Sequence, residues 1–416
     1  MDVLLLSVQS SVEEIIMRSM LEGIRVIDFT ANVAGPATTT FLADMGAEVI
    51  KVEKPGWGDD ARLFPPYVNG FSAPFIVMNR GKKGVVIDMK KPEGIALFKE
   101  MIATADVFVE NYKPGVMKKL GCDYETLRAI NPKLVMCSLS GYGQYGALAD
   151  RPAYDSIIQA RSGFMSVTGF ADRPPVKAGP IVIDLATAMQ AAFAICAALF
   201  ARERTGEGEY LDVSMYDTAI NLIGGVWTDY TVTGKVPGRT GNRYPYVTPF
   251  DTFEAKDGYF MVCSAGDLTY HKLCDAMGRP DLKSDQRFVN LFVRNDNEPA
   301  LKQIIQDWVG SRTIAELIEV TTKFDVPAAP VVNIREMIEH PHTKDRGLHV
   351  DVEQPGRGTV NIYGPASKAR NSEIRVRGGA PELGQHNAWM LRDLLGKSQE
   401  EAGAIVASGA LGAQPN

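Results

Sequence analysis

The chain has 416 residues, of which 45% are hydrophobic and 23% are charged, and its formal net charge is −6. The two percentages are ordinary for a soluble globular protein. The length predicts two or three domains whose cores need no disulfide or metal. The acidic balance disfavours a nucleic-acid-binding or anionic-membrane-binding protein, because such proteins present a basic surface.

The cysteines and the two most apolar stretches favour a cytoplasmic location. The first apolar stretch, at the N-terminus, lacks a basic region and runs into Glu13 and Glu14, which disfavours a signal peptide. The second, residues 186–201, is short for a membrane span, so we expect a buried helix. The cysteines form no CxxC pair, which is typical of free thiols in a reducing compartment: Cys122, Cys137, Cys196, Cys263 and Cys274.

Regular elements are predicted from Gly23 onward, so residues 1–19 are expected to be an extension outside the fold. Residues 24–28 predict a strand, residues 37–46 a helix and residues 47–52 a second strand. A strand, a helix and a strand in close succession predict a βαβ unit with parallel strands and a right-handed crossover.

The same alternation continues toward residue 225, which predicts one open α/β, Rossmann-like domain over residues 20–225. The helix that follows Asp184 is long and apolar, as expected of a buried helix. The other elements predicted in this part are strands at 84–88, 105–109, 134–139 and 210–215, and helices at 92–104 and 124–130.

Beyond residue 225 the predicted organisation changes. Residues 226–249 are expected to form a linker, because residues 236–249 are rich in Gly, Pro, Arg and Tyr without a period. Residues 250–335 predict a smaller α+β domain, and residues 336–416 predict a second linker and a C-terminal return to the large domain. The elements predicted here are a hairpin at 252–262, helices at 269–277, 298–309, 314–324 and 385–395, and strands at 349–352 and 358–362.

One glycine motif is similar to a dinucleotide-binding fingerprint. Residues 141–146 match GxGxxG and follow a predicted strand. Such a fingerprint opens a helix, whereas Pro152 argues against a helix through the residues that follow. We therefore expect a flexible loop that lets the backbone approach a ligand, rather than a bound dinucleotide.

Four residues in a polar stretch after the small domain could bind a metal: His340, His342, Asp345 and His349. Imidazole and carboxylate groups are ordinary metal ligands. A solvated loop explains the same residues, so we expect no metal site.

Asp184 follows a short apolar segment and precedes the long helix. The pattern alone allows two roles for its carboxylate. It could cap the helix by accepting N–H groups of the first turn, or it could be a nucleophile that the helix dipole keeps ionised. Spacing does not separate these two roles.

Basic residues cluster after the early strands, where ligands bind in open α/β sheets. Such clusters suit a polyphosphate such as coenzyme A, although scattered solvated side chains would give the same pattern. The three groups are Lys51, Lys54 and Arg62; Arg80, Lys82 and Lys83; and Lys113, Lys118 and Lys119.

A series of ordered motifs resembles the class III CoA-transferases, the formyl-CoA transferase and carnitine CoA-transferase family, from Leu21 to Leu395. The N-terminal motif is LEGIRVIDFT at 21–30, followed by VAGP at 33–36 and LADMGAEVIKVEKPGWGDD at 42–60. Later motifs are NRGKKG at 79–84, VFVENYKPG at 107–115, SGYG at 140–143, AYD at 153–155 and SG at 162–163.

The resemblance implies a Rossmann-like large domain and a small α+β domain joined by long linkers, with two chains forming an interlocked-ring homodimer. It also implies that CoA passes from an acyl-CoA donor, expected to be succinyl-CoA, to a carboxylic acid, expected to be a dicarboxylate. Glutarate, malate, citramalate, mesaconate and aryl-substituted succinates are acceptors of this kind. The CoA thioester is a substrate, and no permanently bound cofactor is expected.

The family's nucleophilic aspartate follows a Pro-Pro-Val segment and precedes an apolar helix, and here residues 174–176 precede Asp184. The resemblance thus makes Asp184 the catalytic residue. Its carboxylate would form mixed anhydrides and an aspartyl-CoA thioester, which divides one difficult exchange into easier steps. Backbone N–H groups would stabilise each oxyanion.

The resemblance also implies residues that bind CoA or lie near the thioester. The formyl-transferring members have Gln at the position of Val33, a basic residue at that of Pro152, and a run of glycines over the site that residues 236–260 lack. These departures disfavour a formyl-CoA/oxalate specificity. The implied residues are Val33, Ala34, Lys54, Asn111, Tyr112 and Lys119 for CoA, Arg151, beside the position of the family's basic residue, for CoA or substrate, and Tyr154 and Asp155 near the thioester.

Two alternatives remain open. A 2-methylacyl-CoA racemase or epimerase would share the fold and the aspartate, but racemases pair a His with an Asp as opposed acid and base. This chain has Tyr154 and Asp155 at that point and no histidine before His271. The chain could also be the active subunit of a heteromeric CoA-transferase, with a related chain as its partner.

A dicarboxylate acceptor needs a cationic or hydroxyl partner for its distal carboxylate. The predicted linker supplies four candidates by composition and location: Arg239, Arg243, Tyr244 and Tyr246. We expect neither a nucleic acid nor a membrane as a partner.

Overall fold

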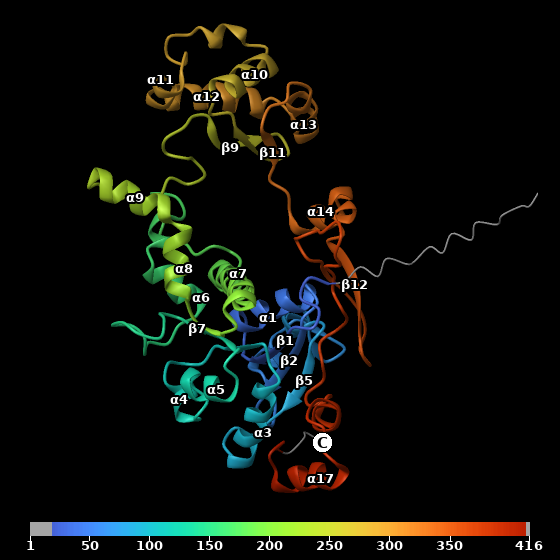
Figure 1. Cartoon of the computed structure of the whole chain (residues 1–416). Helices are drawn as coiled ribbons and strands as arrows, with labels where there is room; N and C mark the ends of the chain where they lie inside the picture. The colour runs from blue at the N-terminus through green and yellow to red at the C-terminus, as the bar shows by residue number, and fades with distance from the viewer. Residues whose placement is uncertain (1–18, 413–416) are drawn as a thin grey trace, which may run out of the picture. The chain divides into compact units, whose positions relative to one another are not determined.

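The computed structural model describes residues 19–412, so the predicted extension at 1–19 lies, apart from Ser19, outside the described residues. The chain divides into two compact units, whose elements are labelled in Figure 1. Unit 1 comprises Met1–Tyr154, Ile183–Thr218 and Gly347–Asn416, and unit 2 comprises Asp155–Val182 and Ala219–Arg346.

These boundaries differ from the predicted ranges. Residues 155–182, which the sequence placed in the large domain, belong to unit 2. Helix α9 (Gly224–Thr233) occupies the first part of the predicted linker, and residues 234–249 form no helix or strand. The reason is visible in the composition, because the Gly and Pro residues of the predicted linker all lie in that second part.

A six-stranded sheet forms the core of unit 1. Its order is β5-β2-β1-β6-β7-β8, and every neighbouring pair is parallel. In chain order this is the 3-2-1-4-5-6 arrangement of a doubly wound fold, so the predicted Rossmann-like architecture is confirmed. The strands are β1 (Arg25–Phe29), β2 (Glu48–Glu53), β5 (Lys83–Val86), β6 (Val107–Glu110), β7 (Val135–Ser140) and β8 (Glu209–Ser214).

Helices cover both faces of this sheet (Figure 1). Successive residues of a strand face opposite sides, so Ile27 packs in the core that contains α3 and α5, whereas Val26 packs with α1 and α7. The helices are α1 (Ala34–Asp44), α2 (Ala73–Asn79), α3 (Pro92–Ala103), α4 (Val116–Lys119), α5 (Tyr124–Ile130), α7 (Val182–Thr205) and α8 (Met215–Leu222).

Helix α7 is longer than the sequence predicted. It has 24 residues, and within residues 19–412 it is the one helix long and apolar enough to cross a membrane by length and composition. Its small and branched side chains Ala191, Ile195 and Leu199 pack against the sheet, while 33% of its most apolar window is buried. The predicted helix is therefore confirmed, but only one of its faces is buried within the chain.

The C-terminal part of unit 1 packs back onto the sheet. His386 Nδ1 accepts the N–H of Gly84 at 3.0 Å and Asn387 Oδ1 accepts the N–H of Val86 at 2.9 Å, so the tail bonds to edge strand β5. The remaining elements are the hairpin of β12 (His349–Gln354) and β13 (Gly358–Tyr363), the short pair β3 (Tyr67–Val68) and β4 (Phe71–Ser72), α16 (Asn387–Trp389), α17 (Gln399–Ser408), a 3₁₀ turn at Asp60–Leu63 and a π-helical turn at Met390–Leu394.

Unit 2 is an α+β unit with its own core. The predicted hairpin is confirmed as β9 (Phe250–Ala255) and β10 (Gly258–Cys263), and β11 (Ala328–Pro330) pairs with β10. Leu273, Ile305 and Leu317 are buried in its core. The helices are α6 (Asp155–Arg161), α9 (Gly224–Thr233), α10 (Asp267–Met277), α11 (Leu291–Asp296), α12 (Glu298–Gly310), α13 (Ile314–Lys323), α14 (Ile334–Glu339) and α15 (Pro341–Asp345), with 3₁₀ turns at Phe164–Val167 and Pro280–Lys283.

Candidate active site

The strand order of unit 1 places a topological switch point between β1 and β6. The chain leaves these neighbouring strands toward opposite sides of the sheet, and ligands of open α/β sheets bind beyond the carboxyl ends of the strands at such a point. Residues 30–34 follow β1, and Asn111 and Tyr112 follow β6. The sheet thus brings together two segments that the resemblance implies in CoA binding.

Val33 and Ala34 form the start of α1 at the switch point. Val33 holds the N-cap position, no side chain caps the helix, and Ala34 is buried. The N–H groups of the first turn have no acceptor within the helix, and together with the helix dipole they favour binding of an anion or a developing oxyanion. A Cβ added at Gly35 would clash with Thr30 Cβ and lie 3.0 Å from Asn111 Cγ, so the close packing of α1 on the turn at Thr30 requires glycine.

Asn111 bonds the turn that precedes α1. Its Nδ2 donates to the carbonyl of Ala31, and its Oδ1 accepts the N–H of Ala31, each at 2.8 Å. Both polar atoms of the amide are therefore engaged with backbone. Whereas the resemblance implies a CoA contact for Asn111, the structure shows it holding the turn.

Lys54 remains at the surface after β2. Its Nζ lies 2.8 Å from Asp60 Oδ1 and 5.0 Å from the centroid of the Trp57 ring. The indole N–H of Trp57 donates to the same carboxylate at 3.0 Å. The hydrogen bond from Lys54, and to a smaller extent the one from Trp57, lowers the pKa of Asp60. An ammonium group and an exposed aromatic ring are thus available beside the switch point to an anionic or planar ligand group.

Tyr112 is fixed by its ring and by its backbone. The ring packs on Phe29 with 4.8 Å between centroids, and burial raises the pKa of the phenol to about 12. Its N–H donates to Glu110 Oε2 at 2.8 Å. Lys119, the last residue of α4, is exposed.

Glu110 is a buried carboxylate that the sequence analysis did not single out. It ends β6 and is 3% exposed, and burial raises its pKa to about 7. The available signal was an acid that closes an otherwise apolar strand directly before Asn111 and Tyr112.

A cavity of about 150 Å³ lies beside Glu110. Ser138 Oγ and Gln144 Nε2 are buried there with no hydrogen-bond partner among the described residues. Polar groups in a cavity of this size are ordinarily satisfied by water. The lining residues are Glu110, Lys113, Gly115, Met117, Lys118, Asp123, Tyr124, Met136, Ser138, Gln144 and Tyr210.

The glycine motif at 141–146 forms a loop, as predicted. Residues 141–154 contain turns and bends without a helix or strand, and α6 begins only at Asp155. Because no helix opens directly after the motif, it lacks the phosphate-binding geometry of a dinucleotide fingerprint.

Three residues implied in substrate binding, of which Tyr154 and Asp155 are implied near the thioester, lie at the end of this loop and the start of α6. Arg151 and Tyr154 are exposed, the latter 72%. Asp155 is buried, and its carboxylate accepts from Gln159 Nε2, while Gln159 Oε1 accepts the N–H of Ala178 at 2.8 Å. Gln159, which is bonded to Asp155 within α6, thereby connects α6 to the segment that leads to α7.

Asp184 lies in the first turn of α7, which begins at Val182. The interpretation of Asp184 as the N-cap is therefore wrong, because the residue is already helical. A crossover helix that leads into β8 runs antiparallel to the strands, so its first turn lies at the carboxyl end of the sheet. The half-buried carboxylate thus lies at the same end as the switch point, and the helix dipole favours its ionised form.

Several of the predicted basic residues point inward, which corrects the expectation of a broad basic site. Lys51 and Lys82 are buried, Lys51 on the internal strand β2 and Lys82 directly before the edge strand β5. A buried cation requires a partner. The pairs are Lys51–Asp59 (2.9 Å), Lys82–Asp28 (2.8 Å), Arg62–Glu53 (2.7 Å), Arg80–Asp44 (2.7 Å) and the half-exposed Lys83–Glu48 (2.5 Å), while Lys54, Lys113, Lys118 and Lys119 remain exposed.

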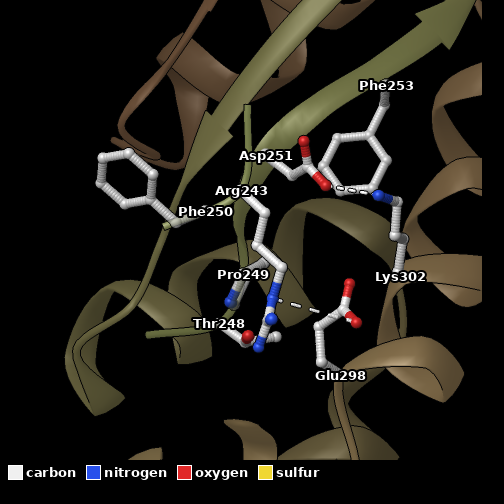
Figure 2. A pocket seen from close by; sticks show the side chains of 8 residues that line it. All are labelled: Arg243, Thr248, Pro249, Phe250, Asp251, Phe253, Glu298 and Lys302. Carbon is white, nitrogen blue, oxygen red and sulfur yellow. Dashed lines mark hydrogen bonds and ion pairs between the residues drawn. The ribbon is translucent and has the colours of Figure 1, made fainter. Parts of the chain in front are cut away.

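Arg243, an acceptor-side candidate, is paired inside unit 2. Figure 2 shows it pointing toward Glu298, with 3.9 Å between its Nε and the carboxylate, and its Nη2 donates to Asn295 at 3.1 Å. Nearby, Lys302 pairs with Asp251 at 2.5 Å. The cavity between them is about 10 Å³, room for a single water, so Arg243 would have to leave Glu298 to bind an acceptor carboxylate.

The other acceptor-side candidates differ in exposure. Arg239 donates to the carbonyls of Phe170 and Arg173 at 3.1 and 2.9 Å, so it supports a turn of the backbone. Tyr244 and Tyr246 are exposed, and their rings lie 6.1 Å apart. The two phenols are thus the accessible members of this set.

The histidines considered as metal ligands form local hydrogen bonds. His340 accepts the N–H of His342 at 3.1 Å at the start of α15, and the side chains of His349 and Asn361 lie 3.0 Å apart. Across residues 19–412, no group of three or more His, Cys, Asp or Glu side chains is placed to hold a metal. The five cysteines are free thiols.

Comparison with known proteins identifies the family. Residues 21–387 match the family model of CoA-transferase family III, and the chain belongs to that family. It is 40% identical over 373 residues to the acetyl-CoA:oxalate CoA-transferase of Acetobacter aceti, which covers 89% of this chain and 95% of that protein. The class implied by the motifs, a class III CoA-transferase, is confirmed.

Two further comparisons agree. The chain is 40% identical over 384 residues to the succinyl-CoA:mesaconate CoA-transferase of Haloarcula hispanica, again over 89% of this chain and 95% of that protein. A solved CAIB/BAIF family protein from Brucella suis is similar with a TM-score of 0.80 and 34% identity, over 91% of this chain and 100% of that one.

Proposed function

We propose that this chain moves CoA from succinyl-CoA to a dicarboxylate through Asp184. The observation that carries the proposal is the place of Asp184, in the first turn of α7 at the carboxyl end of the Rossmann-like sheet. A carboxylate there stays ionised beside the positive end of the helix dipole, as a nucleophile must. The names of the relatives, which specify acyl-CoA donors and dicarboxylate acceptors, support the same reaction.

The exchange would proceed in four displacements. The Asp184 carboxylate attacks the succinyl carbonyl and expels CoA thiolate, which leaves a succinyl–aspartyl anhydride. The thiolate attacks the aspartyl carbonyl, releases succinate and forms an aspartyl-CoA thioester. The acceptor carboxylate displaces the thiolate to form a second anhydride, and the thiolate then attacks the acceptor carbonyl and regenerates the carboxylate. Each step transfers one acyl group, so no redox partner is needed.

The segments after β1, β2 and β6 would hold the CoA. First-turn N–H groups of α1, at Val33 and Ala34, are suited to stabilising an oxyanion. Lys54 and Lys119 are exposed cations that suit phosphate groups, and Tyr112 offers an aromatic surface. CoA enters and leaves as a substrate, and we propose no permanently bound cofactor.

A racemase or epimerase of the same fold is the second candidate. Such an enzyme needs two opposed acid–base groups at the α-carbon. The residues at the relevant point are the exposed Tyr154 and the buried Asp155, which is bonded to Gln159. Neither is a histidine, which favours the transferase.

We further propose a cytoplasmic homodimer with interlocked chains. On the face of α7 turned away from the sheet, Met189, Phe193 and Phe200 are 59%, 70% and 66% exposed in the single chain. An apolar stripe of this kind marks a protein–protein interface, and a second copy would cover it. Light scattering after size-exclusion chromatography should give twice the chain mass, and a monomeric mass would contradict the dimer.

The first experiment is to incubate the purified protein with succinyl-CoA alone, quench it, and map covalent adducts by mass spectrometry. A succinyl or CoA adduct on the Asp184 peptide, absent from Asp184→Ala, would support the mechanism and leave an acceptor screen that includes oxalate, mesaconate and glutarate. No adduct, together with deuterium exchange at the α-carbon of a 2-methylacyl-CoA, would favour the racemase. If neither signal is observed, the next step is to search the native host for a partner subunit.

A further inference from the structure

The turn between β1 and α1 is held by side chains. Residues 30–32 lie outside any helix or strand, so no ladder satisfies their backbone groups. Asn111, after β6, bonds both the N–H and the carbonyl of Ala31 at 2.8 Å. Asp59, after β2, accepts the N–H of Asn32 at 3.0 Å.

Thr30 is held in the same way. Its N–H donates to Asp28 Oδ1 at 3.0 Å, and its carbonyl accepts from Lys51 Nζ at 2.9 Å. Lys51 also pairs with Asp59, and the three charged residues Asp28, Lys51 and Asp59 are 0%, 0% and 4% exposed as whole residues. Side chains from three neighbouring strands therefore fix the backbone of three consecutive residues.

This frame imposes a conformation that the turn would not adopt readily. Asn32 has a φ of +67°, in the left-handed region, which asparagine occupies more often than other non-glycine residues but still uncommonly. The next two residues, Val33 and Ala34, head α1. A ligand that meets a turn already in its bound shape loses no free energy in ordering it, so a preformed turn raises affinity.

Asn111 is the part of the frame that crosses the switch point. It comes from β6 and is half-buried, whereas the charged members come from β1 and β2. Its replacement would release the turn from β6 without leaving an unpaired charge in the interior.

We propose that Asn111 is a positioning residue that sets the affinity for acyl-CoA by holding Ala31, and that it acts through this turn and not by contact of its side chain with CoA. This role rests on the proposed function, because it takes the turn before α1 as part of the CoA site. The commitment of both amide atoms to Ala31 supports it.

The first test compares CoA binding by titration calorimetry in the wild-type chain, Asn111→Ala and the control Asn131→Ala. Asn131 Nδ2 donates to the carbonyls of Ile102 and Ala105 at 3.1 and 2.7 Å, so its loss also removes backbone hydrogen bonds, but at the amino ends of the strands. We expect Asn111→Ala to raise Kd about tenfold, equivalent to about 1.4 kcal/mol. Asn131→Ala should leave Kd within about twofold. An unchanged Kd in Asn111→Ala, or equal increases in both variants, would overturn the proposal.

A double-mutant cycle separates action through the turn from direct contact. Asn32→Ala perturbs the turn, since alanine disfavours a positive φ. In that background Asn111→Ala should raise Kd by less than about threefold, because its target is already perturbed. A full tenfold increase in both backgrounds would indicate direct contact with CoA and would refute the role assigned here.

Hydrogen exchange provides a readout that does not need CoA. In the free protein, the peptide containing Ala31 should exchange faster in Asn111→Ala than in the wild type, whereas Asn131→Ala should not change it. Unchanged exchange would overturn the proposal. If the wild type neither binds CoA nor forms an Asp184 adduct, the proposed function fails, and the role of Asn111 in CoA affinity fails with it. Hydrogen exchange of the Ala31 peptide still shows in that case whether Asn111 holds the turn.

Discussion

Two ion pairs of similar length differ in what they do for the molecule. In unit 1, Lys51 and Asp59 are 2.9 Å apart with side chains 0% and 1% exposed. In unit 2, Arg287 and Asp285 are 2.7 Å apart with side chains 55% and 23% exposed. Water and salt screen the second pair, so it contributes little to stability. The first pair also positions backbone groups at the switch point, which shows that charge in unit 1 shapes the candidate site.

The largest effect should come from Asp184→Ala, which tests whether the chemistry belongs to this end of unit 1. We expect kcat to fall by at least about 10³-fold because the acyl acceptor of the first step is gone. CoA should still bind, and the circular dichroism spectrum should be retained. Glu203→Ala, at an exposed acid near the other end of α7, serves as the control. Turnover near the wild-type rate in Asp184→Ala would remove Asp184 from the mechanism.

The comparison of the two ion pairs can be tested directly with Asp59→Ala and Asp285→Ala. The first leaves Lys51 buried without its carboxylate, so we expect the free energy of unfolding to fall by about 3–5 kcal/mol. The second removes the half-buried partner of an exposed arginine, which water can solvate in its place, and its urea midpoint should match the wild type. Similar midpoints for the two variants would show that burial does not distinguish these pairs.

Glu110→Gln should stabilise the fold increasingly as pH rises. The fold raises the pKa of Glu110 from 4.5 to about 7. The free energy of unfolding of the wild type therefore falls as pH rises through this range, because the carboxyl ionises less readily in the folded state than in the unfolded state. Relative to the wild type, the free energy of unfolding of Glu110→Gln should increase by about 2 kcal/mol between pH 5.5 and pH 8. Urea titrations at the two pH values measure this, and a pH-independent difference would contradict the raised pKa.

The smallest effect is expected for Arg243→Ala in unit 2. In the wild type, the guanidinium is expected to leave Glu298 and bind the distal carboxylate of the acceptor. Its loss in Arg243→Ala should raise KM for a dicarboxylate by about three- to tenfold, the size expected for one exposed ionic contact. KM for the acyl-CoA donor should not change. Arg287→Ala is the matched control, and unchanged kinetics with every dicarboxylate tried would exclude this placement.

The sequence predicted most elements of both units, because their apolar periodicity is strong. The strands that became β1, β2, β6 and β7 were predicted within a few residues, and so was the hairpin of β9 and β10. Short helices such as α4 and α6 were missed, since a segment of four to seven residues carries little periodic signal. The start of α7 was misplaced because the cap preference of Asp outweighed the two apolar residues before it.

By itself, the sequence determined the doubly wound sheet, the smaller α+β unit and, through ordered motifs, the family, and it proposed the catalytic role of Asp184. Only the tertiary structure decided which charges are exposed and which are internal. Lys51 and Lys54 are three residues apart, yet one is buried against Asp59 and the other is exposed. Likewise Asn111 reaches Ala31, 80 residues earlier in the chain. Such pairings depend on strand order and register, which bring distant segments together and leave no periodic trace in the local sequence.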